Sequence, residues 1–244
     1  MKSFKHVASL SGLKRTSKLN WYFRDQIFSG VDTENKKLID IGGGNGLASI
    51  WSLMEGNCKE ALVVDPLSDG SNSRMFEQFQ KMKTASGVGE RLQFLDGTLE
   101  DLNSEGNNFD IALMHNSINH INEEMTPMLT FSEKARNAFL KEFRSIRSLM
   151  ADNGILIISD CSNRNFFGDM GIKNPIAPTI NWTVHQSPHV WSSLIEASGY
   201  KCLKTTWTTR RELGRFGHAI LGNKVGAYLT NSHFSLAFKA VACD

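Results

Sequence analysis

A short apolar run that leads into a glycine-rich turn constrains this chain more than any other feature. Residues 38–46 read LIDIGGGNG, and a helical pattern follows directly. Glycines at such a turn allow positive φ angles and let a ligand approach the backbone closely. A dinucleotide fingerprint would need a glycine where Leu47 stands, and a P-loop would need Gly-Lys-Ser/Thr, which is absent. The turn therefore predicts a ligand-binding loop of another kind.

Apolar runs alternate with amphipathic stretches along the chain. The runs are KLIDI, ALVVD, RLQFL, FDIALM and GILIISD, and helices are expected between them at about 46–56, 73–86 and 131–150. This βαβ rhythm is typical of a parallel sheet with helices on both faces. Asp152 to Gly154 read as the turn that stops the last of these helices before the strand at 154–160. A strand near 201–208, helices near 210–228 and a final strand HFSLAFKAV are expected to complete the fold.

The domain organisation follows from the same pattern. We expect one main domain over residues 36–244, preceded by a helical appendage over residues 1–35. An aromatic stripe in that appendage, around Trp21 to Phe23, either packs against the main domain or forms a lid over a ligand. Insertions on the substrate side are expected near 161–187, a long connection with little periodicity, and near 210–230.

Composition excludes several classes of protein. The sequence has no apolar run long enough for a transmembrane helix and no apolar N-terminal signal, so a cytoplasmic location is expected. Four cysteines are scattered without a CxxC pair, which argues against a zinc ribbon or a disulfide framework. The 27 Lys and Arg nearly balance the 25 Asp and Glu, although basic residues crowd the first 24 positions and residues 210–215. Such groups either face an anionic substrate or form a solvated helix face.

Acidic residues follow two further predicted strands. Asp65 ends the second one, at the sheet edge beside the glycine turn, where a carboxylate can accept hydrogen bonds from both ribose hydroxyls of a nucleoside. It could instead simply open the Asp65-Pro66 turn. Asp96 follows the third strand, in the run Asp96-Gly97-Thr98, and can accept a hydrogen bond from an exocyclic amine such as adenine N6.

Taken together, these residues resemble the class I S-adenosylmethionine (SAM) dependent methyltransferase superfamily over about residues 37–160. The resemblance implies an α/β fold with a Rossmann-like, seven-stranded, mostly parallel sheet, helices on both faces and an antiparallel last strand. It also implies SAM as cofactor and S-adenosylhomocysteine as product. The residues that it assigns to the cofactor are Asp40, Gly42, Gly44 and Gly46 for the methionine part, Asp65 for the ribose, Asp96, Gly97 and Thr98 for adenine, and Met114 and His115 as flanking residues.

Histidines are the candidate catalytic groups. Methyl transfer chiefly needs alignment of the two reactants, and a base helps when the acceptor is a hydroxyl. His115 and His120 lie at the end of the fourth strand, and His120 could equally well have a structural role in the loop. His185 could reach the same pocket from the long loop.

The expected reaction is O-methylation of a small molecule or glycan. No Asn/Asp-Pro-Pro-Tyr/Phe motif follows the fourth strand, where residues 114–117 read MHNS, so nucleic acid is a disfavoured partner. No metal is expected, because His115-Asn116 replaces the acid of metal-dependent relatives, although Asp160 and Asn163 follow the fifth strand. Two alternatives remain. One is an RNA or protein methyltransferase that holds its substrate with the basic N-terminal segment, and the other is a non-catalytic SAM-binding protein. A homodimer through the aromatic N-terminal helix is also compatible with the sequence.

Overall fold

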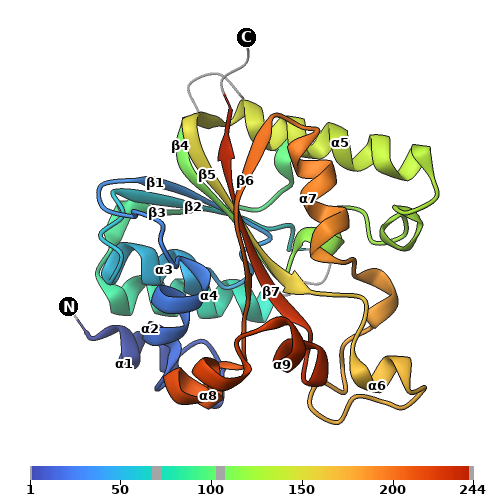
Figure 1. Ribbon diagram of the computed structural model, residues 1–244. Helices are drawn as coiled ribbons and strands as arrows, with labels where there is room; N and C mark the ends of the chain where they lie inside the picture. The colour runs from blue at the N-terminus through green and yellow to red at the C-terminus, as the bar shows by residue number, and fades with distance from the viewer. Residues whose placement is uncertain (1, 68–72, 103–107, 242–244) are drawn as a thin grey trace.

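The computed structural model describes residues 2–67, 73–102 and 108–241. Within these ranges seven strands form one sheet, in the order β3-β2-β1-β4-β5-β7-β6 (Figure 1). Strand β7 pairs antiparallel with both β5 and β6, and the other neighbouring strands are parallel. The predicted fold class is therefore confirmed. The strands are β1 Lys37–Ile41, β2 Glu60–Val64, β3 Leu92–Leu95, β4 Phe109–His115, β5 Met150–Cys161, β6 Tyr200–Trp207 and β7 His233–Ala240.

Helices cover both faces of the sheet (Figure 1). On one face α5 and α7 bury Phe139, Phe143 and Trp191 against β4, β5 and β7. On the other face the helices from α1 to α4 bury side chains such as Trp51 and Phe79. Burial of one such large apolar side chain stabilises the fold by about 1.5–3 kcal/mol. The α-helices are α1 Phe4–Ser9, α2 Leu19–Tyr22, α3 Leu47–Met54, α4 Ser73–Ser86, α5 Glu133–Ser148, α6 Phe166–Asp169, α7 Pro188–Glu196, α8 Gly214–Leu221 and α9 Lys224–Leu229.

The N-terminal segment packs onto the sheet rather than standing apart from it. Helix α2 continues into a π-helix, Phe23–Ile27, and Phe23 and Leu19 belong to the same buried cluster as Leu38 of β1 and Trp51 of α3. The aromatic stripe thus supplies core contacts, while Tyr22 beside it is only half-buried. The division into an appendage and a main domain stays a prediction.

The start of β5 differs from the expectation. Residues 152–154 do not form a turn ahead of the strand; α5 ends at Ser148, and β5 already begins at Met150. Phe109 of β4 pairs with Met150 of β5, whereas Ile111 pairs with Ile155, so the register shifts between these two pairs. Asn153, with φ 64°, takes up the irregularity, since asparagine tolerates the left-handed region better than most residues.

Local signals place α7 as the sequence predicts. The Ser187 hydroxyl accepts a hydrogen bond from Val190 N, and Pro188 is the first helical residue, where its missing N–H is not needed. Among the described residues no helix is long and apolar enough to cross a membrane.

Candidate active site

The glycine turn lies where β1 ends and α3 begins. Gly42, Gly44 and Gly46 have φ angles of 67°, 56° and 69°, a region that most side chains avoid. At Gly43 a Cβ atom would lie 2.7 Å from Asp40 Cγ and 2.9 Å from Val63 Cγ1. The backbone itself therefore forms the surface of the turn.

Asp40 is buried directly beneath this turn. Its Oδ2 atom accepts a hydrogen bond of 2.7 Å from Ser49 Oγ of α3, while Oδ1 has no hydrogen-bond partner among the described residues. Burial raises the pKa of the Asp40 carboxyl to about 7, and the negative charge of Asp65 adds to this rise. A cationic ligand group placed here would meet an unsatisfied carboxyl oxygen.

Asp65 stands next to the turn, as predicted from its position after β2. It is 6% exposed, and its Oδ2 atom accepts a 2.7 Å hydrogen bond from Gly44 N. A carboxylate has room for further hydrogen bonds, because its two oxygens offer about four acceptor sites. This hydrogen bond joins the end of β2 to the glycine turn at one edge of the sheet.

The third strand end contributes a more exposed group. Asp96 is exposed, and its Oδ1 atom accepts a 3.1 Å hydrogen bond from Leu67 N. Thr98 caps the short 3-10 helix Leu99–Asp101. The backbone N–H and the hydroxyl of Thr98 both donate hydrogen bonds to Asp101 Oδ2. Gly97 packs against Asp101, whose Oδ2 would lie 2.6 Å from an added Cβ. Leu67 thus fixes Asp96, and Asp101 fixes Gly97 and Thr98, on the same sheet edge.

A cavity of about 240 Å³ opens beside Asp40 and Gly43. Its other walls come from the N-terminal helices, the end of β4 and the 3-10 helix Arg211–Leu213 that follows β6. The polar residues that line it outside the glycine turn are Tyr22, His115, Asn116 and Arg211. One cavity therefore joins the glycine turn to groups suited to proton transfer.

His115, predicted to flank the cofactor and to act in catalysis, lies in this cavity at the end of β4. Its Nε2 atom is 3.0 Å from the Tyr22 hydroxyl. Burial, assisted by the charge of Arg211, lowers the pKa of His115 to about 4, so the imidazole is neutral at neutral pH. Burial raises the pKa of Tyr22, so its phenol stays protonated and can donate to Nε2.

A second buried histidine, His233, contacts Asn116, the neighbour of His115 in sequence. It was not identified from the sequence. His233, the first residue of β7, bonds through Nε2 to Asn116 Oδ1 at 2.8 Å and through Nδ1 to Thr208 Oγ1 at 2.7 Å. Burial, together with the charges of His115 and His185, lowers its pKa to about 3. Only the antiparallel pairing of β7 with β5 brings His233 to this edge, and no local motif indicates that.

His185, the third predicted catalytic histidine, is paired with a buried acid at the end of β5. Its Nδ1 atom lies 3.1 Å from Asp160 Oδ1, and the two side chains are 12% and 1% exposed. A carboxylate that holds one imidazole nitrogen leaves the other free to accept a proton. The effect of His185 on the pKa of His233 places it beside the same cluster of histidines.

His185 is not among the residues that line the cavity, and two further predicted site residues, His120 and Met114, lie away from it. The His120 side chain is 63% exposed and pairs with Glu123, with Nδ1 2.9 Å from Oε2, and His120 is not among the residues that line the cavity. Met114 is fully buried in the core cluster that contains Phe139. Because side chains alternate along a strand, Met114 faces the core while its neighbour His115 faces the cavity.

The described residues contain no group of three or more ligating side chains that could hold a metal ion. Cys58, Cys161 and Cys202 are free thiols, and Cys243 lies outside the described residues. The metal-free mechanism stays a prediction.

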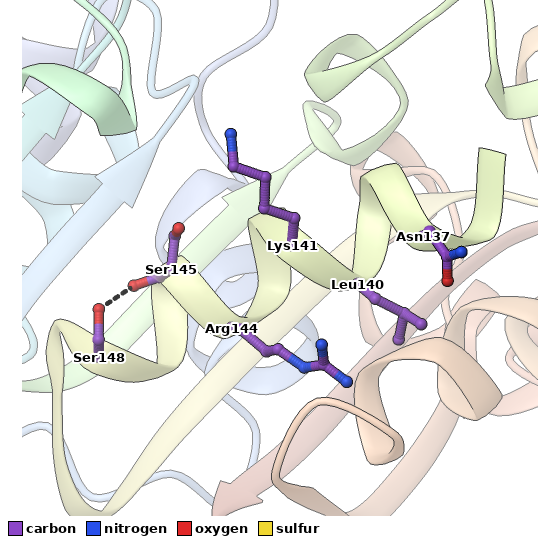
Figure 2. Close-up of a pocket in the computed structure, with 6 residues that line it drawn as sticks. All are labelled: Asn137, Leu140, Lys141, Arg144, Ser145 and Ser148. Atoms are coloured by element: carbon purple, nitrogen blue, oxygen red, sulfur yellow. Dashed lines mark hydrogen bonds between the residues drawn. The ribbon is translucent and has the colours of Figure 1, made fainter. Parts of the chain in front are cut away.

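A larger hollow, of about 470 Å³, lies along α5 (Figure 2). The six residues that line it all belong to that one helix, and two of them are joined by a 2.8 Å hydrogen bond from the Ser148 hydroxyl to the Ser145 carbonyl. It lacks the glycine turn, the buried acids and the histidines, so we place the candidate site in the smaller cavity.

Comparisons with known proteins identify the family of the chain. A family model described as "Methyltransferase domain" matches residues 22–205. A Listeria monocytogenes protein, provisionally described as a SAM-dependent methyltransferase, superposes with a TM-score of 0.56 at 12% identity over 86% of this chain and 92% of its own. An O-methyltransferase family 2 protein from Planctomyces limnophilus, solved with apigenin, gives 0.59 at 14% identity over 99% and 62%.

A third similar structure is the complex of the Haloferax volcanii Trm112 methyltransferase activator with a provisionally assigned methyltransferase. It gives a TM-score of 0.57 at 12% identity, over 98% of this chain and 96% of that one. No curated protein matches the chain. At such identities the superpositions establish the fold alone, whereas the family model covers both the glycine turn and the end of β4.

Proposed function

The chain belongs to the methyltransferase domain family and is a SAM-dependent methyltransferase, and on that premise we propose that it methylates a hydroxyl of a small molecule or glycan. The observation that carries the proposal is the shared cavity, in which a neutral histidine, His115, lies on the same walls as Asp40 and Gly43.

The residues at the sheet edge fit the cofactor. Gly43 and Asp40 line the cavity in which the methionine part would lie, the unsatisfied Asp40 Oδ1 suits its ammonium group, and Asp65 suits the ribose hydroxyls. When bound, SAM supplies a methyl group on a positively charged sulfur, which a nucleophilic oxygen can take. Asp96, with Gly97 and Thr98, lies where adenine would extend along the same edge.

In this proposal His115 receives the proton of the acceptor hydroxyl. Its Nε2 atom now faces the Tyr22 hydroxyl at 3.0 Å, so a second hydroxyl can take that place with little rearrangement. A neutral imidazole has the lone pair that a general base needs, although a low pKa weakens the driving force for proton transfer.

His185 is the second candidate for the base, because the buried Asp160 carboxylate stabilises an imidazolium. The two candidates separate experimentally: Asp160→Asn should lower turnover strongly only if His185 is the base. His120 remains the weakest of the three predicted catalytic residues on geometry, since it is exposed and paired with Glu123.

Two measurements test the proposal. Calorimetric titration with SAM and S-adenosylhomocysteine, with NAD as a control, should show binding of the adenosyl ligands alone. A screen with methyl-labelled SAM against hydroxyl, amine and thiol forms of one small-molecule scaffold should then label the hydroxyl form. Labelling of amines or thiols alone would contradict O-methylation and leave the methyltransferase assignment intact.

An RNA or protein acceptor is the second candidate. Lys2, Lys5, Lys14 and Arg15 are all exposed on the N-terminal segment, whose residue Leu13 lines the cavity, and could contact a polyanion. This alternative predicts that binding of a labelled RNA weakens steeply between 50 and 200 mM salt, by about 10³–10⁵-fold if 6–10 phosphates are contacted.

A further inference from the structure

Arg211 is a charged residue of the cavity that the proposed mechanism does not use. It begins the 3-10 helix Arg211–Leu213, after β6, and lines the same cavity as Tyr22 and His115. The family model ends at residue 205, so Arg211 lies beyond the part of the chain that the family shares. A cavity residue outside the shared part is well placed to determine which acceptor binds.

The guanidinium group of Arg211 is not satisfied by the protein. It carries five N–H donors, yet it makes no hydrogen bond within the described residues, and its Nε atom is buried. Its one counter-ion there is Glu212, whose Oε1 atom lies 3.3 Å from Nε without hydrogen-bond geometry. The Arg211 side chain is 24% exposed, so an ion bound to it would be partly shielded from water.

Positive charge exceeds negative charge around this group. Glu212 is shared with Arg210, whose Nε lies 3.5 Å from Oε2, and Lys18 Nζ donates to the Glu212 carbonyl at 2.7 Å. The Glu212 carboxylate therefore pairs with two guanidinium groups, and Lys18 adds a third positive charge through the backbone carbonyl. An anion that enters the cavity beside Arg211 reduces this imbalance.

The charge of Arg211 acts on the His115 side of the cavity. It lowers the pKa of His115 and partly offsets the burial that raises the pKa of Tyr22. The causes of the raised pKa of Asp40 are burial and Asp65, with hydrogen bonds from Ser49 opposing them, and Arg211 is not one of them. Because Arg211 lines the same cavity as Tyr22 and His115, an anion bound to it would share that cavity with the proposed proton acceptor.

We propose that Arg211 binds a carboxylate of the methyl acceptor, so that the substrate is a small hydroxy acid. This inference rests on the proposed function for the location of the acceptor. The planar guanidinium matches a carboxylate with two parallel hydrogen bonds, which fixes the orientation of the acceptor as well as its affinity. Leu13, Leu19 and Phe23 in the same walls suit an apolar carbon skeleton between the carboxylate and the reacting hydroxyl.

Benzoate and its neutral amide, benzamide, are suitable probes, because they share an apolar ring and differ in charge. Each is titrated into protein saturated with S-adenosylhomocysteine and followed by ligand-detected NMR. The variants are Arg211→Gln, which removes the charge, and Arg215→Gln as matched control, since Arg215 is 73% exposed and pairs with Asp25 at 3.3 Å. Affinity for S-adenosylhomocysteine is measured on all three proteins.

Benzoate should bind the wild type and Arg215→Gln alike and Arg211→Gln at least tenfold more weakly, and it should bind more tightly than benzamide only to the two proteins that keep Arg211. Equal binding of the two probes to the wild type, or unchanged benzoate affinity in Arg211→Gln, would overturn the proposal. A loss of S-adenosylhomocysteine affinity in Arg211→Gln with no loss for benzoate would assign Arg211 to the cofactor carboxylate and overturn it too. Failure of hydroxyl methylation in the acceptor screen would count against O-methylation alone, since the probe titration measures Arg211 directly.

Discussion

The two halves of the site are built in different ways. The proposed cofactor half consists of backbone and short side chains at the ends of β1 and β2, and its key hydrogen bond joins Gly44 to Asp65, 21 residues apart. The proposed acceptor half gathers side chains from distant parts of the chain: Tyr22 contacts His115 across 93 residues, and His233 contacts Asn116 across 117. The first half can be deduced from a local motif, whereas the second exists only once the sheet has formed.

This difference implies a division of roles. Substitutions in the cofactor half should change affinity for SAM, and substitutions in the acceptor half should change turnover or choice of acceptor. The following variants test whether that division holds.

The largest effect is expected at His115. His115→Gln keeps a polar side chain but removes the imidazole, and loss of a general base should lower kcat by about 10²–10⁴-fold. Affinity for S-adenosylhomocysteine, measured by calorimetry, should change little. His120→Gln is the control, because His120 is exposed and outside the cavity lining. A kcat loss in the control rather than in His115→Gln would restore His120 as the base.

Asp65→Ala should act in the opposite half. It removes a carboxylate expected to accept ribose hydroxyls, and hydrogen bonds to charged groups contribute about 1.5–3 kcal/mol, or about 10–150-fold in the Kd of SAM. The value of kcat at saturating SAM should stay within a few-fold of the wild type. Glu34→Ala, at an exposed residue away from the site, controls for general charge effects. An unchanged Kd would remove Asp65 from the cofactor site.

Tyr22→Phe should have a smaller effect, and it should strengthen rather than weaken binding of the acceptor. The Tyr22 hydroxyl occupies the position at His115 Nε2 that the acceptor needs, and one hydrogen bond contributes about 0.5–1.5 kcal/mol. Its loss should therefore lower the KM for the acceptor by about 2–12-fold, as steady-state kinetics would show. A higher KM would mean that Tyr22 helps to bind the acceptor.

The smallest signal is a proton released on cofactor binding. With a pKa of about 7, the Asp40 carboxyl is about half protonated at pH 7, and the ammonium group of SAM favours its charged form. Binding should thus release about half a proton at pH 7 and more near pH 6, where the amino group of SAM is already protonated. Calorimetry in buffers of different ionisation enthalpy measures this number, and Asp40→Asn should abolish it. Proton uptake in that range would contradict an ammonium group at Asp40.

The same division, between the proposed cofactor and acceptor halves, separates what the sequence predicts from what it does not. The sheet, the glycine turn and the positions of Asp65 and Asp96 were predictable, because each follows a strand and the carboxyl ends of parallel strands share one edge. Arg211 and His233 could not be placed, since their positions depend on the pairing of β6 and β7. The early start of β5 was missed because Asn-Gly sequences usually mark a turn, whereas here Asn153 lies in a strand irregularity.

The N-terminal segment also bears on the rate at which ligands exchange. Leu13, Leu19, Tyr22 and Phe23 wall the cavity, and Leu19 and Phe23 are at the same time fixed in the core. If ligands enter past these side chains, exchange is coupled to local opening of the segment. We therefore expect substitutions that tighten its packing to raise thermal stability and slow product release together, so that a more stable enzyme turns over more slowly.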